Sequence, residues 1–406
     1  MEFLDKSMGD PIQYMSNVYG YGLKNERPPF TFKSDDWEDL AKERMCANSL
    51  GYICGNAGTG ETSRNNRSAF QKWSITPNRL VKTEGYPSIK SKVLGQDFAT
   101  PIAVAPIGVQ RIFHNDGEIA VAKAAACEKV PYIYSTAAAT SIEDAATANG
   151  DGTRWYQLYW PSNEHNEITK SLLKRAQENG FSALVVTLDT YKLGWRPSDL
   201  DNGYNPFLHA DTIGNALGFT DPVFRKKFEA KHGKTIEENM EVAAREWTSV
   251  IFPEFSHSWE DLQFLRENWN GPIILKGIQS VPDAKKAVKA GIDGIIVSNH
   301  GGRQQDGGTS SLDCLVKIQK AISSDIEILF DSGIRCGSDI AKALALGAKM
   351  VLIGRPYIYG LVLGGQVGVS HVLRSLLGDL IMNLHLAGIP SIGKEELNTD
   401  CLQYES

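Results

Sequence analysis

Gly294-Ile295-Ile296-Val297 is an apolar run that is followed at once by Ser298-Asn299-His300-Gly301-Gly302-Arg303-Gln304-Gln305-Asp306. The run contains no polar alternation, which is typical of a parallel strand covered on both faces. The abrupt change supplies a titratable base, a fixed cation and two glycines that let the backbone approach a ligand. The stretch therefore predicts a functional site at the carboxyl end of a buried strand. An ordinary polar loop with an incidental histidine is the alternative.

The composition of the 406-residue chain is that of an ordinary globular protein, with 42% hydrophobic and 22% charged residues. The formal net charge is -6 and no long charged block occurs, so nucleic acid and anionic membrane surfaces are not expected as partners. We find no membrane-spanning run, no secretory signal in residues 1–20 and no metal-type spacing among the six cysteines. We expect a soluble, cytoplasmic protein without a metal.

Apolar strands alternate with helical patterns from Pro101 onward. Short strands rich in Val, Ile and Leu are predicted at residues 102–105, 131–135, 154–158, 183–188, 272–275, 293–297, 327–330 and 350–353. Helices are predicted at residues 117–128, 141–148, 165–179, 258–268, 281–290, 312–323, 338–346 and from 357 onward. Eight strand–helix units in about 270 residues favour an α/β fold of the (β/α)8 TIM barrel type over an open doubly wound sheet, which is the alternative.

The other segments are predicted to extend a barrel that spans residues 101–390. Residues 1–100 should form an N-terminal extension, irregular to about residue 35, with helices at 35–50 and 63–73 that pack on the barrel. Residues 391–406 should form a C-terminal tail. After the fourth strand comes an insertion, residues 189–258, with a charged helical pattern in 222–252. Loops this long are usually lids or binding loops, so we expect a lid.

Polar residues end nearly every predicted strand, and the carboxyl ends of barrel strands converge on one face. The last two loops provide glycines whose N–H groups can face an anion, and arginines that can fork onto its oxygens, which predicts a phosphate site. Either of these arginines, Arg335 or Arg355, could alone simply cap a helix. The strand-end candidates are Pro106, Ile107, Gly108, Ser135, Gln157, Tyr159, Thr187, Asp189, Lys276, Ser298, His300, Asp331, Gly333, Arg335, Gly354 and Arg355.

This lining is more polar than a small phosphorylated sugar requires. A planar cofactor such as FMN would fit the additional polar residues. The flavin ring needs donors at its pyrimidine edge, and the reduced ring gains from a nearby cation, a role suited to Lys276. A lysine at a strand end could instead form a Schiff base, as in barrel aldolases. A barrel aldolase or isomerase that uses Lys276 therefore stays open as a second class of function.

The chain resembles the FMN-dependent L-2-hydroxy acid oxidase and dehydrogenase family from about Leu50 to the C-terminal helices. The motifs that carry the resemblance are, in order, Gln157-Leu158-Tyr159, Pro272-Ile273-Ile274-Leu275-Lys276-Gly277, Ser298-Asn299-His300-Gly301-Gly302-Arg303-Gln304, Asp331-Ser332-Gly333-Ile334-Arg335 and Gly354-Arg355-Pro356. The resemblance implies a (β/α)8 barrel that binds FMN and oxidises an L-2-hydroxy acid to the 2-oxo acid. It also implies homotetramers or homo-octamers.

The resemblance also implies roles for individual residues. His300 would be the catalytic base and Asp189 the carboxylate that orients it. Arg196 and Arg303 would bind the substrate carboxylate, and a second pair, Tyr52 and Tyr159, would donate hydrogen bonds to the substrate. The flavin contacts would be Pro106, Ile107, Gly108, Ser135, Gln157, Thr187, Lys276, Ser298, Asp331, Gly333, Arg335, Gly354 and Arg355. Taken singly, the tyrosines could be ordinary rim aromatics, and Asp189 or Arg196 could form a structural ion pair.

Two departures point to one branch of the family. Ala137 stands where many plant-type glycolate oxidases have Trp, and Gly108 stands where the family often has Ala. With the Asp331-Ser332-Gly333 variant, the long insertion and the stretch Tyr52-Ile53-Cys54-Gly55-Asn56-Ala57-Gly58, these residues resemble the lactate 2-monooxygenase branch. In that branch the 2-oxo acid and peroxide react before they separate, which yields a decarboxylated acid, CO2 and water. An oxidase that releases 2-oxo acid and H2O2 is the alternative, and a catalytically silent flavin-binding module is a third possibility.

Overall fold

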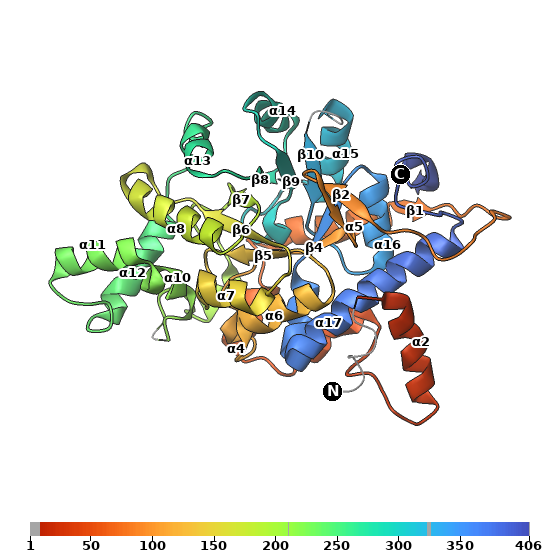
Figure 1. Cartoon of the computed structure of the whole chain (residues 1–406), viewed down its shortest axis with the longest axis horizontal. Helices are drawn as coiled ribbons and strands as arrows, with labels where there is room; N and C mark the ends of the chain where they lie inside the picture. The colour runs from red at the N-terminus through yellow and green to blue at the C-terminus, as the bar shows by residue number, and fades with distance from the viewer. Residues whose placement is uncertain (1–8, 210, 323–325, 406) are drawn as a thin grey trace.

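A computed structural model describes residues 9–209, 211–322 and 326–405, so residues 1–8 of the predicted arm and Ser406 of the predicted tail lie outside the described residues. Its centre is a closed parallel barrel (Figure 1) with the strand order β10-β11-β4-β5-β6-β7-β8-β9. The strands are β4 (Ile102–Val104), β5 (Tyr132–Ser135), β6 (Arg154–Tyr159), β7 (Leu184–Thr187), β8 (Ile273–Ile278), β9 (Gly294–Val297), β10 (Glu327–Phe330) and β11 (Met350–Ile353). The predicted (β/α)8 barrel is confirmed, and the open-sheet alternative is wrong.

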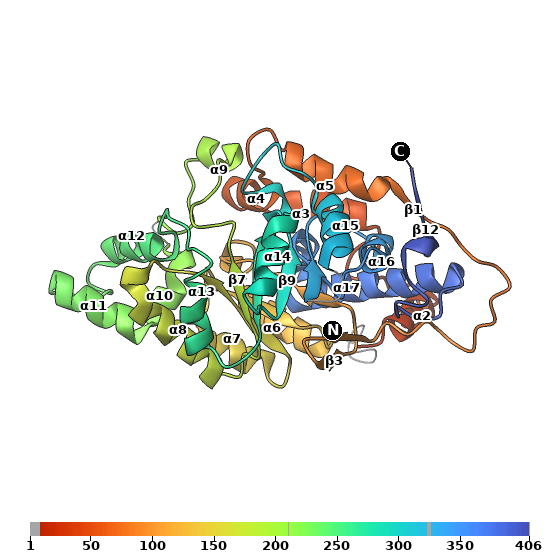
Figure 2. The same cartoon turned by 90° about the horizontal axis from the view of Figure 1, so that it is seen from above.

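Helices follow the barrel strands and surround them (Figure 2). Ser141 and Ser280 begin two of them by accepting hydrogen bonds from Asp144 N and Asp283 N, as N-cap residues do. Residue 323, the predicted end of one helix, lies outside the described residues. The helices are α6 (Gly117–Cys127), α7 (Ile142–Asn149), α8 (Asn166–Glu178), α13 (Leu262–Asn268), α14 (Val281–Lys289), α15 (Ser311–Ile322), α16 (Gly337–Ala345) and α17 (Arg355–Leu386).

Two apolar layers explain why the barrel strands show no polar alternation. Ile296 of β9 points into the barrel, whereas Ile295 and Val297 pack in the outer layer against the helices. The hairpin of β2 (Ser91–Val93) and β3 (Gln96–Phe98) joins the inner layer, and the Phe98 ring meets Trp155 edge-on at 6.1 Å. The hairpin lies at the amino end of the barrel, where Ser91 Oγ donates to the Lys349 carbonyl. The carboxyl end is left for polar groups.

The N-terminal region is more helical than predicted. Residues 11–22 form helix α2 (Pro11–Gly22), so the irregular arm is wrong here, because Asp10 caps the backbone N–H groups of Ile12 and Gln13 and proline starts the first turn. The single helix predicted at 35–50 is divided in two. The elements up to the barrel are η1 (Ser34–Asp36), α3 (Trp37–Lys42), α4 (Ala47–Cys54), α5 (Glu61–Gln71) and β1 (Trp73–Ile75).

The C-terminal tail returns to this region. Strand β12 (Leu402–Tyr404) pairs antiparallel with β1, and a 3₁₀ turn, η6 (Thr399–Cys401), precedes it. Three more 3₁₀ turns follow barrel strands, namely η2 (Gln110–Ile112), η3 (Asn163–His165) and η5 (His300–Gly302). The described helices include none that is both long enough and apolar enough to cross a membrane. The division at residues 100 and 390 stays a prediction.

The insertion after β7 is largely helical where it is described; residue 210 lies outside that part. Its elements are α9 (Pro197–Asp201), η4 (Ile213–Asn215), α10 (Ala216–Thr220), α11 (Pro222–His232) and α12 (Met240–Ile251). Figure 1 shows α10, α11 and α12 at one end of the molecule, beside α8. Asp221 caps α11 and pairs with Arg175 of α8 at 3.3 Å, while Trp247 packs on Phe224 at 5.1 Å between ring centroids. The helical part of the insertion is thus fixed to the barrel. The segments before and after α10–α12 reach the carboxyl ends of the barrel strands.

Candidate active site

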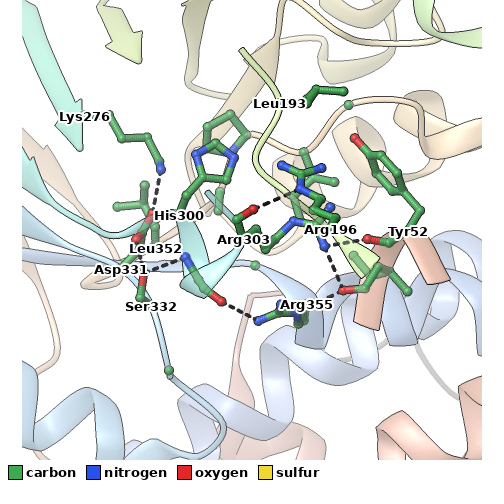
Figure 3. Close-up of a pocket in the computed structure, with 18 of the residues that line it drawn as sticks. Tyr52, Leu193, Arg196, Lys276, His300, Arg303, Asp331, Ser332, Leu352 and Arg355 are labelled. Carbon is green, nitrogen blue, oxygen red and sulfur yellow. Dashed lines mark hydrogen bonds and ion pairs between the residues drawn. The ribbon is translucent and has the colours of Figure 1, made fainter. Parts of the chain in front are cut away.

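The carboxyl ends of the strands open into a cavity of about 890 Å³, a volume that includes space open to solvent (Figure 3). Its walls come from the strand-end loops, from α4 and from the insertion. The predicted site residues that line it are Tyr52, Pro106, Ile107, Gly108, Tyr159, Arg196, Lys276, His300, Arg303, Asp331, Gly333, Arg335, Gly354 and Arg355.

The other predicted site residues lie beneath or beside this cavity. Ser135 Oγ donates to Gln157 Oε1 at 2.9 Å, and Gln157 Nε2 donates to Thr187 Oγ1 at 3.0 Å. These buried side chains form a polar row across β5, β6 and β7. Ser298 accepts a hydrogen bond from Lys276, and Asp189 contacts His300. The structure therefore brings all the predicted site residues to one end of the barrel.

His300 and Asp189 form a close pair, with Nδ1 and Oδ1 2.8 Å apart. Thr190 Oγ1 donates to the same carboxylate oxygen at 3.0 Å. The approach depends on Gly277, which has φ +103°, because a Cβ there would lie 3.0 Å from Asp189 Cγ. The bulge between Lys276 and Ile278 in the β8–β9 register falls at this glycine.

The protonation states of this pair follow from burial and from each other. Burial alone would raise the pKa of Asp189, but the charge and hydrogen bond of His300 outweigh it and hold that pKa at about 2. Burial lowers the pKa of His300, and Asp189 offsets this only in part. At neutral pH, Asp189 is therefore ionised and His300 is neutral. An ionised carboxylate only accepts hydrogen bonds, so Nδ1 of His300 carries the proton and Nε2 keeps its lone pair.

Lys276 lies on the opposite side of the cavity from the arginines (Figure 3). Its Nζ is 3.2 Å from Asp331 Oδ2 and donates to Ser298 Oγ at 3.0 Å. Burial by itself would lower the pKa of Lys276, but Asp331 and Asp189 raise it above its ordinary value. A lysine held as an ammonium ion is a poor nucleophile, which argues against the Schiff-base alternative.

Arg196, Arg303 and Arg355 concentrate positive charge on the other side. Arg303 Nη1 donates to the carbonyls of Tyr52 at 2.5 Å and Gly55 at 2.9 Å, and Arg355 Nη2 donates to Asn56 Oδ1 at 2.8 Å. Arg196 Nη2 donates to Gln304 Oε1 at 2.6 Å. Within the described ranges, no carboxylate pairs with any of these three guanidinium groups.

This unpaired charge favours the binding of anions. Burial, together with repulsion from Arg196 and Arg355, lowers the pKa of Arg303 to about 9. A bound carboxylate or phosphate would relieve that repulsion and use the planar donor geometry of arginine. One cavity thus offers cations for a phosphate, an ammonium ion for a reduced flavin and space for a ring system, so the residues present fit FMN. The described residues contain no cluster of His, Cys, Asp and Glu that could hold a metal ion.

Sequence reasoning missed several residues of this cavity. Leu193, Phe207 and Phe252 come from the insertion and form an apolar wall. The Phe252 ring lies 5.2 Å from the Tyr159 ring and 5.1 Å from the Phe207 ring. These three residues lie in irregular segments, so no helical or strand periodicity in the sequence identifies them. Ser332 also lines the cavity, and its position within the Asp331-Ser332-Gly333 motif was a signal that could have found it.

Comparisons with known proteins agree with this geometry. A family model described as FMN-dependent dehydrogenase matches residues 41–403. The chain is 59% identical over 396 residues to an FMN-dependent alpha-hydroxy acid dehydrogenase of Schizosaccharomyces pombe, covering 98% of this chain and 97% of the relative. It is 41% identical to an L-lactate oxidase of Lysinibacillus sphaericus, covering 91% and 93%.

A solved structure extends the likeness to three dimensions. The crystal structure of a mandelate oxidase superposes with a TM-score of 0.78 at 32% identity, covering 93% of this chain and 99% of that chain. The fold, the paired His300 and Asp189, the cluster of arginines and the family match lead to the same conclusion. The chain belongs to the FMN-dependent α-hydroxy acid dehydrogenase family, and it is an oxidoreductase whose cofactor is FMN.

Proposed function

We propose that the protein oxidises a small, lactate-like L-2-hydroxy acid to the 2-oxo acid and passes the electrons to O2. The observation that carries this proposal is a neutral His300, backed by ionised Asp189, in the same cavity as Arg196 and Arg303, neither of which pairs with a carboxylate of the described residues. A hydroxy acid supplies the two groups that this site lacks, a carboxylate for the arginines and a proton for the base. The name of the L-lactate oxidase relative supports the substrate class.

In this proposal, Arg303 and Arg196 bind the substrate carboxylate. Burial raises the pKa of Tyr159, so its hydroxyl stays protonated and donates to the substrate together with Tyr52. His300 Nε2 accepts a proton from the substrate, and Asp189 stabilises the imidazolium that forms. FMN supplies the acceptor for the two electrons.

The cofactor would be held by residues on the other side of the cavity and beneath it. Lys276 would place its positive charge beside the flavin ring, and Arg335 and Arg355 would bind the phosphate with the backbone at Gly333 and Gly354. The remaining proposed flavin contacts are Pro106, Ile107, Gly108, Ser135, Gln157, Thr187, Ser298 and Asp331.

Anaerobic mixing with substrate tests the proposal. The purified protein should be yellow, and L-lactate, but not D-lactate, should bleach the flavin absorption. A panel of L-2-hydroxy acids with longer and aromatic side chains would identify the substrate if lactate reacts slowly. A yellow protein that no member of the panel bleaches would instead indicate the silent flavin-binding module.

We also propose that the 2-oxo acid stays in the site and is decarboxylated by peroxide, so that lactate and O2 give acetate, CO2 and water. Retention is supported by the apolar wall of Leu193, Phe207 and Phe252 and by the tight loop at Gly108. A Cβ on Gly108 would lie 2.5 Å from the Ala137 carbonyl oxygen and 2.6 Å from its Cβ. An alanine there would therefore push the loop away from β5. Release of 2-oxo acid and H2O2 is the second candidate, which the oxidase name of the relative supports.

Simultaneous measurement of CO2, 2-oxo acid and H2O2 during turnover distinguishes these outcomes. Gly108→Ala and Phe252→Ala should each shift the products toward free 2-oxo acid and H2O2. Phe255→Ala is the matched control, because Phe255 is exposed on the same insertion and does not line this cavity. An unchanged product ratio in both test variants would refute retention by the wall and the loop.

The family resemblance further supports a homotetramer or homo-octamer, and we propose a cytoplasmic location as the default for a chain of this ordinary globular composition. Light scattering of the purified protein and imaging of the tagged chain in cells test these two proposals.

A further inference from the structure

Ser332 joins the two sides of the site through its hydroxyl group. Its Oγ donates to Asp331 Oδ1 at 2.8 Å and accepts a hydrogen bond from the Gly301 N–H at 3.0 Å. Asp331 follows β10, and Gly301 follows the proposed base His300 after β9. One side chain therefore contacts both the carboxylate that pairs with Lys276 and the loop that carries the base.

These bonds close into a ring. Lys276 Nζ lies 3.2 Å from Asp331 Oδ2 and 3.0 Å from Ser298 Oγ. Ser298 Oγ also accepts from the His300 N–H at 3.1 Å. The ring links the carboxyl ends of β8, β9 and β10, and Figure 3 shows the part that contains Lys276, Asp331 and Ser332 beside His300.

The backbone of Ser332 has a conformation in which glycine is the usual residue. Its φ is +85°, in the left-handed region that residues with a Cβ rarely adopt. Such a conformation persists only where surrounding contacts enforce it, and it is concentrated at functional sites. His300, which precedes the bonded Gly301 in the chain, also has a positive φ, of +57°. A serine here is explained by its hydroxyl rather than by the turn.

We propose that Ser332 is a positioning residue that couples Lys276 and the bound flavin to the His300 loop. This inference rests on the proposed function. The hydroxyl donates to Asp331 and so partly satisfies the carboxylate, which leaves more of the Lys276 charge for the reduced flavin. The same oxygen holds the Gly301 N–H and thereby orients the loop from which His300 meets the substrate.

Two variants of the FMN-loaded protein separate this role from a structural one. Ser332→Gly removes the hydroxyl and relieves the backbone, whereas Ser332→Ala removes the hydroxyl and keeps the unfavourable φ. The control is Lys129→Gly, because Lys129 is exposed before β5, at the amino end of the barrel, and has φ +56°. Ser332→Gly and Lys129→Gly should each melt at or above the wild-type temperature.

The functional measurements should then separate these two glycine variants. In Ser332→Gly, the midpoint potential of bound FMN, obtained by reductive titration without substrate, should move to a more negative value. The limiting rate of anaerobic reduction by L-lactate should fall about tenfold, as expected for loss of a hydrogen bond to a charged group, while the substrate concentration at half-saturation stays within about twofold. Ser332→Ala should show the same changes and a lower melting temperature, and Lys129→Gly should match the wild type.

A Ser332→Gly protein with the wild-type potential and reduction rate would overturn the inference. Loss of FMN from that variant at unchanged stability would also overturn it, because Ser332 would then be a direct ligand of the cofactor. The potential is measured without a hydroxy acid, so the coupling to Lys276 is tested even if no hydroxy acid reduces the wild-type protein. That last result would refute the proposed function alone.

Discussion

His300 at the rim of the barrel and His371 in α17 are two partly or fully buried histidines whose pKa is lowered by burial, yet their surroundings differ in kind. His300 lines the cavity and has Asp189 on Nδ1, and within the described residues no hydrogen bond forms at Nε2. Both nitrogens of His371 have partners, Tyr14 Oη at 2.7 Å and the Thr31 carbonyl at 3.2 Å. Burial alone thus makes a neutral histidine, whereas a carboxylate at one nitrogen and cavity space beside the ring are what the proposed base requires.

The neighbouring arginines repeat this contrast. Arg303 is close to Arg196 and Arg355 and has no carboxylate partner in the described part of the chain. Arg374, one turn after His371, pairs with Glu128 at 2.8 Å, and both side chains are 1% exposed. The pair helps to fix α17 on α6, and the Tyr14 hydrogen bond fixes α2 on α17. The same residue types therefore form a reactive site where their charges are left unpaired and a joint between helices where they are satisfied.

The largest expected effect is on the rate of flavin reduction, after substitution of the histidine at the barrel rim. His300→Gln removes the base, and the rate of anaerobic flavin reduction should fall by about 10²–10⁴-fold or more while FMN stays bound. His371→Gln should change that rate by less than about threefold, because His371 takes no part in the reaction. Stopped-flow absorbance measures both. A His300→Gln protein that reduces FMN at the wild-type rate would refute the role of His300 as the base.

The next effect is on stability. Arg374→Met leaves the buried Glu128 carboxylate without its partner, so the free energy of unfolding should fall by about 3–5 kcal/mol. Urea unfolding followed by circular dichroism measures this loss. Glu128→Gln combined with Arg374→Met should recover part of it, since no buried charge is then left. Equal stability of the single and double variants would show that the pair does not hold α17.

A smaller effect depends on pH. Burial, with a further contribution from Arg374, lowers the pKa of His371 to about 4, although the Thr31 carbonyl opposes this. The folded state therefore favours the neutral ring. Its contribution to stability is complete above pH 6.5, falls as the pH decreases toward 4 and levels off below it, a total of about 3 kcal/mol.

Unfolding experiments between pH 7 and pH 4 measure this contribution. His371→Gln should flatten the pH dependence over that window. A His371→Gln protein with the wild-type slope would assign the acid sensitivity to other groups.

The smallest expected effect is at Arg303. Arg303→Lys keeps the positive charge but loses the two-pronged contact with a carboxylate, so the substrate concentration at half-saturation should rise about 10- to 100-fold with a smaller change in limiting rate. Steady-state kinetics with L-lactate separates the two parameters. A fall in limiting rate alone would place Arg303 in the chemical step rather than in substrate binding.

Much of the site was predictable because of the barrel topology. The apolar runs identified the strands, and parallel strands of a closed barrel must present their carboxyl ends on one face, so residues as distant as Gln157, Lys276 and Arg355 were correctly grouped. The helix α2 was missed because the residues after Pro11 show weak amphipathic periodicity, and its stability comes from contacts such as Tyr14 with His371. The break between α3 and α4 was missed for a related reason, since no proline or glycine marks it.

The sequence by itself determined the barrel, the family and the position of the proposed base, because strand periodicity and strand-end polarity are local properties that the topology converts into a site. Only the tertiary structure decided how the partners of His300 and His371 differ, which arginines pair with a carboxylate within the described part of the chain, and that Phe207 and Phe252 reach the cavity. It also placed Ser332 between Asp331 and Gly301. These features depend on loops and helices that meet across long stretches of chain, where packing, and not any repeating pattern, sets the contacts.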